Sequence, residues 1–262
     1  MEAFWSGWWW PLATAVLGFV FTGLIFAQWL HRRKPHQLAW SVGMLFYAVA
    51  AVMESVAEAT GSWDPTVYRI YIVLAASLVG FLGLGSYYLI AKKKTGPHIY
   101  LGALVGWLAV FLYGTSTAEL KTGLLKALPG IVVGGQALGD SLSFPRVMSL
   151  PFNITGSFFL LGGALLSIWR FARKREFAYR MWANVLIALG TVIIGAMGSM
   201  ARAGNTVGLY VGEMVASAVL LAGFLMAGTL ERGAKQALEH RREHAQHQAE
   251  VHAAEIMHPP EA

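Results

Sequence analysis

The feature that most constrains this chain is a series of long apolar runs separated by short polar or basic clusters. A run of about 20 apolar residues has the length that an α-helix needs to cross the hydrocarbon core of a bilayer. We expect seven such helices, over residues 11–30, 38–60, 68–91, 99–114, 147–169, 182–200 and 207–229. The chain is therefore expected to be an all-α, polytopic membrane protein with seven transmembrane helices.

The composition favours the same fold class. Of the 262 residues, 56% are hydrophobic and only 13% are charged, against roughly a quarter charged in an average soluble domain. The absence of cysteine excludes disulfides, thiolate metal sites and cysteine nucleophiles. The net charge of +6 is held in short clusters between the apolar runs. This distribution is typical of membrane proteins. We therefore expect the chain to lie in a lipid bilayer and not to bind nucleic acid.

The distribution of Lys and Arg predicts the orientation in the membrane. Of the 20 Lys and Arg residues, 15 lie in the loops after the first, third and fifth expected helices or in the C-terminal tail. Basic residues accumulate on the cytoplasmic side of membrane proteins. We expect the N-terminus outside, the C-terminus in the cytoplasm, and a multi-pass protein of the cell's inner (plasma) membrane.

Two segments fall outside the spanning helices. The outer loop, 115–145, contains a capping-box pattern from Ser116 to Glu119 followed by leucines at helical spacing, which predicts a short amphipathic helix on the membrane surface. Residues 130–140 are either a lid or re-entrant piece, or a loop packed over the helix ends. The tail, 231–262, follows the transmembrane domain 1–230 and is expected to be a polar cytoplasmic helix.

An internal repeat relates the two halves of the chain. At a fixed offset of 140 residues, four residues recur: Pro11, Phe19, Gly23 and Trp29 fall on Pro151, Phe159, Gly163 and Trp169. Later, Val79–Leu82 is similar to Ala222–Leu225. We interpret 9–92 and 147–230 as parallel repeats joined by a linker helix at 98–114, a 3+1+3 layout.

This layout resembles the SWEET and PQ-loop transporters and, more distantly, the seven-helix rhodopsins, over residues 5–230. The resemblance implies small-solute transport, with a binding site between the two halves. The segment from Trp63 to Tyr71 also looks like one found in uncharacterised seven-span proteins of Gram-positive bacteria, which implies no function. No functional motif of these families is present, because Pro11 and Pro151 are not followed by Gln and the seventh helix contains no Lys for a retinal Schiff base.

Acidic residues inside the expected spans are the candidate site. Glu54 and Glu58 share one face of their helix, with Glu54 about 9 Å inside its outer end at about 1.5 Å per residue. Glu213 lies about one and a half turns into the seventh helix. Ionisable residues within a membrane are costly and mark functional sites. A carboxyl group buried there can also take part in proton coupling.

The expected ligand-binding residues are Glu54, Arg69, Glu213, Arg202 and Asn153. In this hypothesis an outward-facing pocket pairs Glu54 or Glu213 with Arg69 or Arg202, and Asn153 adds a hydrogen bond. The alternative is that the arginines and Glu58 are interfacial residues that reach water. The deeper acids would then form a purely structural pair.

The missing motifs narrow the class of activity. No histidine lies within an expected span, and the chain contains no Gly-x-Ser-x-Gly or His-Glu-x-x-His sequence. We therefore expect no enzyme, no metal and no cofactor. Three hypotheses remain: a small-solute or proton-linked transporter, a ligand-sensing receptor module, or a non-catalytic membrane subunit. The partner would be an unidentified small molecule, with a second copy or another protein bound through the tail.

Overall fold

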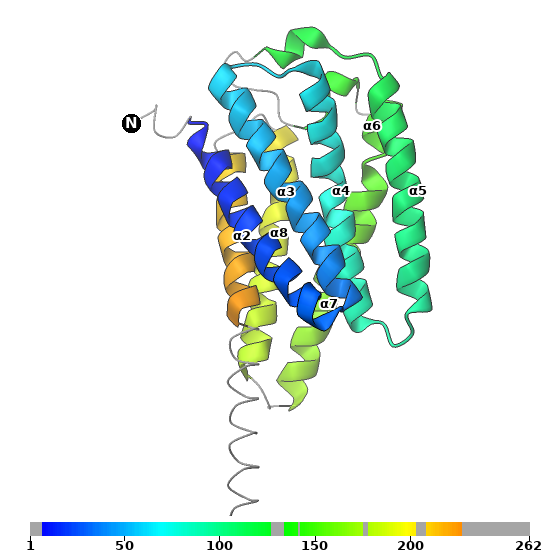
Figure 1. Ribbon diagram of the computed structural model, residues 1–262, viewed down its shortest axis with the longest axis vertical. Coiled ribbons are helices and arrows are strands. Elements are labelled where there is room, and N and C mark those ends of the chain that lie inside the picture. The colour runs from blue at the N-terminus through cyan, green and yellow to red at the C-terminus, as the bar shows by residue number, and fades with distance from the viewer. Residues whose placement is uncertain (1–6, 127–133, 141, 175–177, 203–207, 227–262) are drawn as a thin grey trace, which may run out of the picture.

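The computed structural model describes residues 7–126, 134–140, 142–174, 178–202 and 208–226. Seven long helices in this part of the chain form one bundle (Figure 1). They are α2 (Trp9–Arg32), α3 (Pro35–Thr60), α4 (Pro65–Ile90), α5 (Thr95–Thr117), α7 (Leu150–Lys174), α8 (Ala178–Arg202) and the helix Gly208–Met226, called here the last helix.

Six helices of the described chain are long and apolar enough to cross a membrane. These are α2, α3, α4, α5, the stretch Phe144–Arg170 that contains most of α7, and the last helix. In α8 the apolar stretch, Met181–Ile194, is shorter. The prediction of an all-α, polytopic membrane protein is confirmed.

The first three long helices are delimited by local sequence signals. Pro35 and Pro65 occupy first-turn positions, where a missing N–H costs nothing. The Asp64 side chain caps α4 by accepting hydrogen bonds from the backbone N–H groups of Thr66 and Val67, at 2.8 and 3.0 Å. Gly61 ends α3 at φ +70°, a left-handed conformation that favours glycine. These tight turns make α2, α3 and α4 antiparallel neighbours.

Helix α4 is the centre of the packing. It contacts α3, α5 and α7, while α2 packs on α3 and α8 packs on α7. The α4–α7 crossing is so close that a Cβ atom on Gly156 would collide with the carbonyl group of Val79, and one on Gly83 would lie 2.5 Å from Gly156 Cα. Close approach through glycine is a common means of packing membrane helices, because dispersion contacts replace the hydrophobic effect there.

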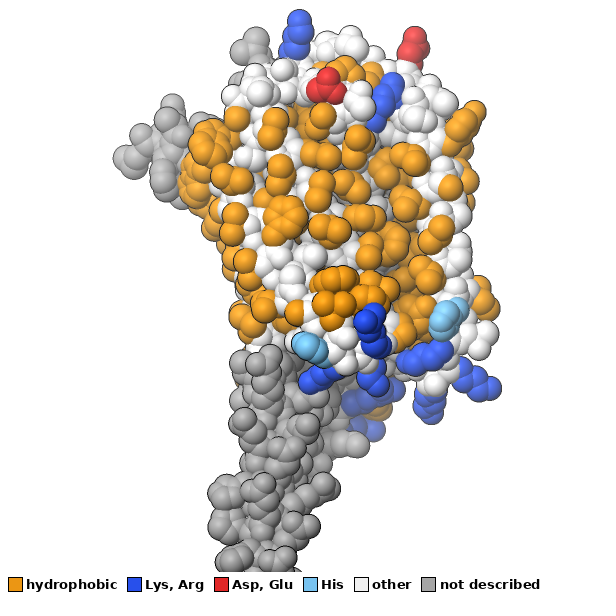
Figure 2. Space-filling view, in the orientation of Figure 1, with side chains coloured by type: hydrophobic (Ala, Val, Ile, Leu, Met, Phe, Trp, Pro, Cys, Tyr) orange, Lys and Arg blue, Asp and Glu red, His pale blue; other side chains and the backbone are white. Residues whose placement is uncertain are grey.

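The outer surface of the bundle is suited to lipid. Large hydrophobic side chains are exposed along the helices, among them Phe19, Val105, Phe158 and Leu189. Figure 2 shows this apolar surface as a broad band, with Lys and Arg side chains gathered mainly at one end of the molecule. The apolar helices imply a lipid bilayer around the protein.

The outer loop differs from the predicted amphipathic helix. Helix α5 continues to Thr117, and short 3₁₀ turns follow at η1 (Thr122–Leu125) and η2 (Gln136–Leu138), before the one-turn helix α6 (Phe144–Val147). The Ser116 hydroxyl donates to the Tyr113 carbonyl group within α5, so it does not form the expected capping box. The start of the 130–140 segment and the tail 231–262 lie outside the described residues.

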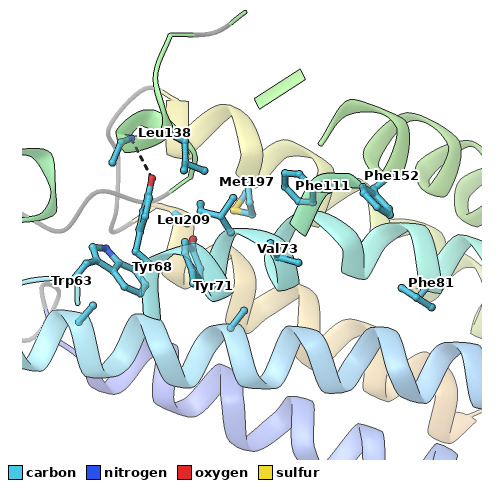
Figure 3. Close-up of a cluster of buried hydrophobic side chains, with 14 of the residues drawn as sticks. Trp63, Tyr68, Tyr71, Val73, Phe81, Phe111, Leu138, Phe152, Met197 and Leu209 are labelled. Carbon is cyan, nitrogen blue, oxygen red and sulfur yellow. Dashed lines mark hydrogen bonds between the residues drawn. The ribbon is translucent and has the colours of Figure 1, made fainter. Parts of the chain in front are cut away.

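An ion pair and a buried tyrosine hold the described part of this loop. Lys121 Nζ lies 2.8 Å from Asp140 Oδ1, and this hydrogen bond from the ammonium group holds the pKa of the Asp140 carboxyl below its usual range. The Tyr68 hydroxyl donates to the Gly134 carbonyl oxygen at 2.6 Å and accepts from the Ala137 N–H at 3.2 Å. Figure 3 shows Tyr68 extending from α4 to this loop beside Leu138. The segment 134–140 is thus a loop packed over the helix ends.

Candidate functional site

The bundle encloses a cavity of about 370 Å³ between α3, α4, α7, α8 and the last helix. Its two acidic residues, Glu54 and Glu213, lie near the helix ends that adjoin the outer loop. The residues that line it are Tyr47, Ala50, Ala51, Glu54, Tyr71, Ala75, Leu78, Val79, Leu82, Gly134, Asn153, Ser157, Leu160, Thr191, Ile194, Met197, Leu209 and Glu213. A volume in this range is that of a small-molecule site.

Glu54 is buried in the wall of this cavity. Its side chain is only 3% exposed, and the Tyr71 hydroxyl donates a buried hydrogen bond of 2.6 Å to Glu54 Oε1. The turn at Gly61 sets the C-terminal end of α3 beside the first turns of α4, which brings these two side chains to the same level of the bundle. The structure therefore gives Glu54 a neutral donor rather than a cation.

Glu213 of the last helix lines the same cavity as Glu54 of α3. Hydrogen bonds from Tyr210 to Glu58 and from Tyr47 to the Glu213 carbonyl oxygen join the two helices on either side of the acids, so both acids face the same space. Oε2 of Glu213 is buried and receives no hydrogen bond from any described residue. The backbone beside it is fixed, because Tyr47 donates to the Glu213 carbonyl oxygen at 2.9 Å and Ser217 donates to the Tyr47 hydroxyl at 2.9 Å.

Two adjacent carboxyl groups have a specific chemical requirement. An ionised carboxylate is an acceptor only, so a hydrogen bond between two carboxyl groups needs a proton on one of them. No Lys, Arg or His is among the described residues that line the cavity. The pair can therefore be satisfied by a proton or by a cation that enters the cavity.

Arg69 does not belong to the cavity, and its predicted pairing with Glu54 or Glu213 is wrong. Its guanidinium group donates to the carbonyl oxygens of Thr115 and Ala118, the latter at 2.8 Å. These carbonyl groups are at the end of α5, where helix carbonyls lack intrahelical partners and favour a cation. Arg69 thus joins the start of α4 to the end of α5.

The other expected residues have different outcomes. Asn153 lines the cavity, although its side chain is exposed and its amide donates to the Ser149 carbonyl oxygen at 2.9 Å. Arg202 ends α8, and its side chain lies outside the described residues. Glu58 is outside the cavity lining, where it accepts a 2.8 Å hydrogen bond from the Tyr210 hydroxyl.

Sequence reasoning missed the hydroxyl groups around the acids. Tyr47 and Tyr71 line the cavity, and Tyr210 and Ser217 lie on the last helix close to Glu213. One signal was present in the sequence: Tyr47 precedes Glu54 by two helical turns, so both residues lie on one face of α3.

The end of the cavity away from the outer loop is largely apolar, although Thr191 also lines it. Leu82 and Leu160 belong both to the cavity wall and to a buried cluster with Phe21, Ile25, Met44, Tyr47, Leu78 and Leu220. A small cavity of about 50 Å³ lies within that cluster. The cavity thus has an acidic part near the outer loop and a largely apolar part away from it.

Comparison of the chain with models of known protein families, with curated proteins and with solved structures finds no match. The described residues also contain no group of three or more His, Cys, Asp or Glu that could hold a metal ion. The cavity itself is therefore the feature of the molecule that bears on its function.

Proposed function

We propose that the chain is a proton-linked transporter of a small solute, with its N-terminus outside and its cavity on the outer half of the membrane. The observation that carries this proposal is that Glu54 and Glu213 line one cavity and that no described Lys, Arg or His lines it with them. Two acids in one buried space favour a shared proton, so the pair is a proton site where a solute also fits. Binding of the solute and release of the proton are then linked.

The arrangement of the helices supports a repeat of the kind found in transporters. In the first half, a Cβ on Gly43 of α3 would meet Leu82 and the Leu78 carbonyl of α4. In the second half, a Cβ on Gly190 of α8 would meet Leu220 and the Ala216 carbonyl of the last helix. The second and third helices of each half are thus packed through the same kind of contact.

The two halves also contact each other in a similar way. The third helix of the first half, α4, crosses the first helix of the second half, α7, at Gly83 and Gly156. The last helix in turn reaches α2, where the Phe21 and Phe224 ring centroids are 5.1 Å apart. A cavity between two such halves fits alternating access by movement of one half against the other.

A receptor that binds its ligand from outside is the second candidate function. The apolar cluster of Phe21, Ile25 and Met44 beneath the cavity favours it, because a receptor needs no path to the cytoplasm. The presence of a cavity disfavours a purely structural subunit. Movement of a solute across the membrane distinguishes a transporter from a receptor.

Proteoliposomes test the proposed function. We expect a solute panel and a pH-sensitive dye inside the vesicles to reveal proton movement coupled to at least one solute. Glu54→Gln and Glu213→Gln should each abolish the coupling, because an amide cannot bind and release the proton. Glu58→Gln is the matched control, since Glu58 lies outside the cavity. Coupling that survives in both cavity variants contradicts the proposal.

A further inference from the structure

The charged side chains that line the cavity indicate the chemistry of its solute. Every described charged side chain that lines it is acidic, namely Glu54 and Glu213. Arg69, the cation nearest in sequence to the lining residue Tyr71, is engaged by carbonyl groups at the end of α5. An anionic solute would meet two carboxyl groups and no opposite charge, so its binding is disfavoured.

A buried acceptor in this cavity lacks a donor. Glu213 Oε2 is buried and receives no hydrogen bond from the described residues, whereas Glu54 Oε1 is already engaged by Tyr71. Leaving a buried carboxylate oxygen without a donor is costly. An ammonium group supplies both a positive charge and several N–H donors, and it would replace the proton that the empty pair needs.

The cavity extends well beyond the two acids. Along α4 its lining runs from Tyr71 to Leu82, a rise of about 16 Å at about 1.5 Å per residue. The part farthest along the helices from the acids is formed by Leu78, Leu82, Leu160 and Thr191, whose hydroxyl group donates to the Ile187 carbonyl oxygen of its own helix. An inorganic cation would leave this apolar part unused, whereas an organic cation would fill it with its apolar body.

We infer that the solute is a small organic ammonium ion, with its cationic head between Glu54 and Glu213 and its apolar body against Leu78, Leu82 and Leu160. The inferred binding of this ion rests on the cavity alone. Its movement across the membrane rests on the proposed function. The cation and the proton compete for one pair of carboxyl groups, so each bound ammonium ion displaces the proton that the pair holds.

Competition with protons predicts the pH dependence of binding. Affinity for an ammonium ion should increase as the pH rises through the range in which the pair loses its proton. The other titratable groups that face the pair are Tyr47 on α3, Tyr71 on α4 and Tyr210 on the last helix, with Glu58 one turn outward of Glu54. Glu58 lies outside the cavity lining, so Glu58→Gln should leave this pH dependence unchanged.

Equilibrium binding to the full chain in lipid nanodiscs tests the inference with a matched set of probes. The probes are 2-phenylethylammonium, the neutral 2-phenylethanol, the anionic phenylacetate, methylammonium and Na⁺. We expect 2-phenylethylammonium to bind roughly tenfold or more tightly than every other probe. Glu54→Gln and Glu213→Gln should each weaken its binding by a similar factor, and Glu58→Gln should leave it unchanged. The Glu54→Gln/Glu213→Gln double variant corrects for partition of the probe into lipid.

The outcomes separate this inference from the proposed function. Equal binding of 2-phenylethanol would show that the solute needs no positive charge. Equal binding of methylammonium or Na⁺ would show that it needs no apolar group. Equal binding to the double variant would show that the probe does not bind at these two acids, which would overturn the inference. If 2-phenylethylammonium binds as expected but no proton moves in proteoliposomes, the ligand class is supported and the transport function is refuted.

Discussion

At the scale of single residues, the hydrogen bond from Tyr71 to Glu54 is the contact that most directly defines the site. Its length is 2.6 Å and both side chains are buried. Tyr71→Phe removes the donor and leaves Glu54 Oε1 buried without it. We expect the free energy of unfolding to fall by about 1–3 kcal/mol, the usual cost of a buried polar group that has lost its partner.

Unfolding in mixed detergent micelles measures this change. Tyr210→Phe is the matched control, because it removes the same hydroxyl group from Glu58, which is only partly buried. The control should lose clearly less stability than Tyr71→Phe. Equal losses in the two variants would mean that burial of Glu54 does not set the energy of its hydrogen bond.

Arg69 gives the second prediction at this scale. The Arg69 guanidinium group donates to two carbonyl oxygens at the end of α5. Arg69→Met should therefore destabilise that helix end and leave the cavity unchanged. We expect faster hydrogen exchange at residues 115–118 and unchanged affinity for 2-phenylethylammonium. A loss of affinity would show that Arg69 contributes to the binding site, which would contradict the structure.

The residue scale also shows where sequence reasoning fails. Arg69 and Tyr71 are two positions apart on α4, so their side chains point about 200° apart at 3.6 residues per turn. The sequence does not state how α4 is rotated about its axis, and that rotation decides which of them faces Glu54. Opposite charge favoured Arg69 as the partner, whereas the structure supplies Tyr71 and a second acid.

At the scale of helices, α4 and α7 cross closely at Gly83 and Gly156. Gly156→Ala would push a methyl group into the carbonyl of Val79. We expect a loss of about 1–3 kcal/mol from overpacking, measured as the free energy of unfolding in detergent. Gly162→Ala on the same helix is the control, because a Cβ there meets nothing within 4 Å.

The control should be neutral or slightly stabilising, since alanine is a better helix former than glycine. A Gly156→Ala variant as stable as the Gly162→Ala variant would show that α4 and α7 do not touch at this point in the membrane.

The positions of the helices were the feature that the sequence predicted best. The expected span 38–60 corresponds to α3 at Pro35–Thr60, and 68–91 corresponds to α4 at Pro65–Ile90, because proline, Asp64 and Gly61 mark their ends. The outer loop was harder to predict. Leucine spacing suggested an α-helix after Ser116, but tertiary contacts of Tyr68 with Gly134 and Ala137 favour short 3₁₀ turns there.

At the scale of the whole molecule, the expected orientation can be tested because the chain contains no cysteine. A single introduced cysteine is then the only target for a membrane-impermeant maleimide. We expect Glu119→Cys to be labelled in intact cells and Lys93→Cys only after permeabilisation. Both positions are exposed and lie at opposite ends of the bundle. The reverse pattern would invert the topology and place the cavity on the cytoplasmic half.

The central claim is that Glu54 and Glu213 share a proton that an ammonium ion displaces. Titration of the purified protein with 2-phenylethylammonium in weakly buffered solution measures proton release directly. We expect release in the wild type and in Glu58→Gln, and none in Glu54→Gln or Glu213→Gln. Binding of the ammonium ion without release of a proton from the wild type, or release that persists in both cavity variants, would contradict the claim.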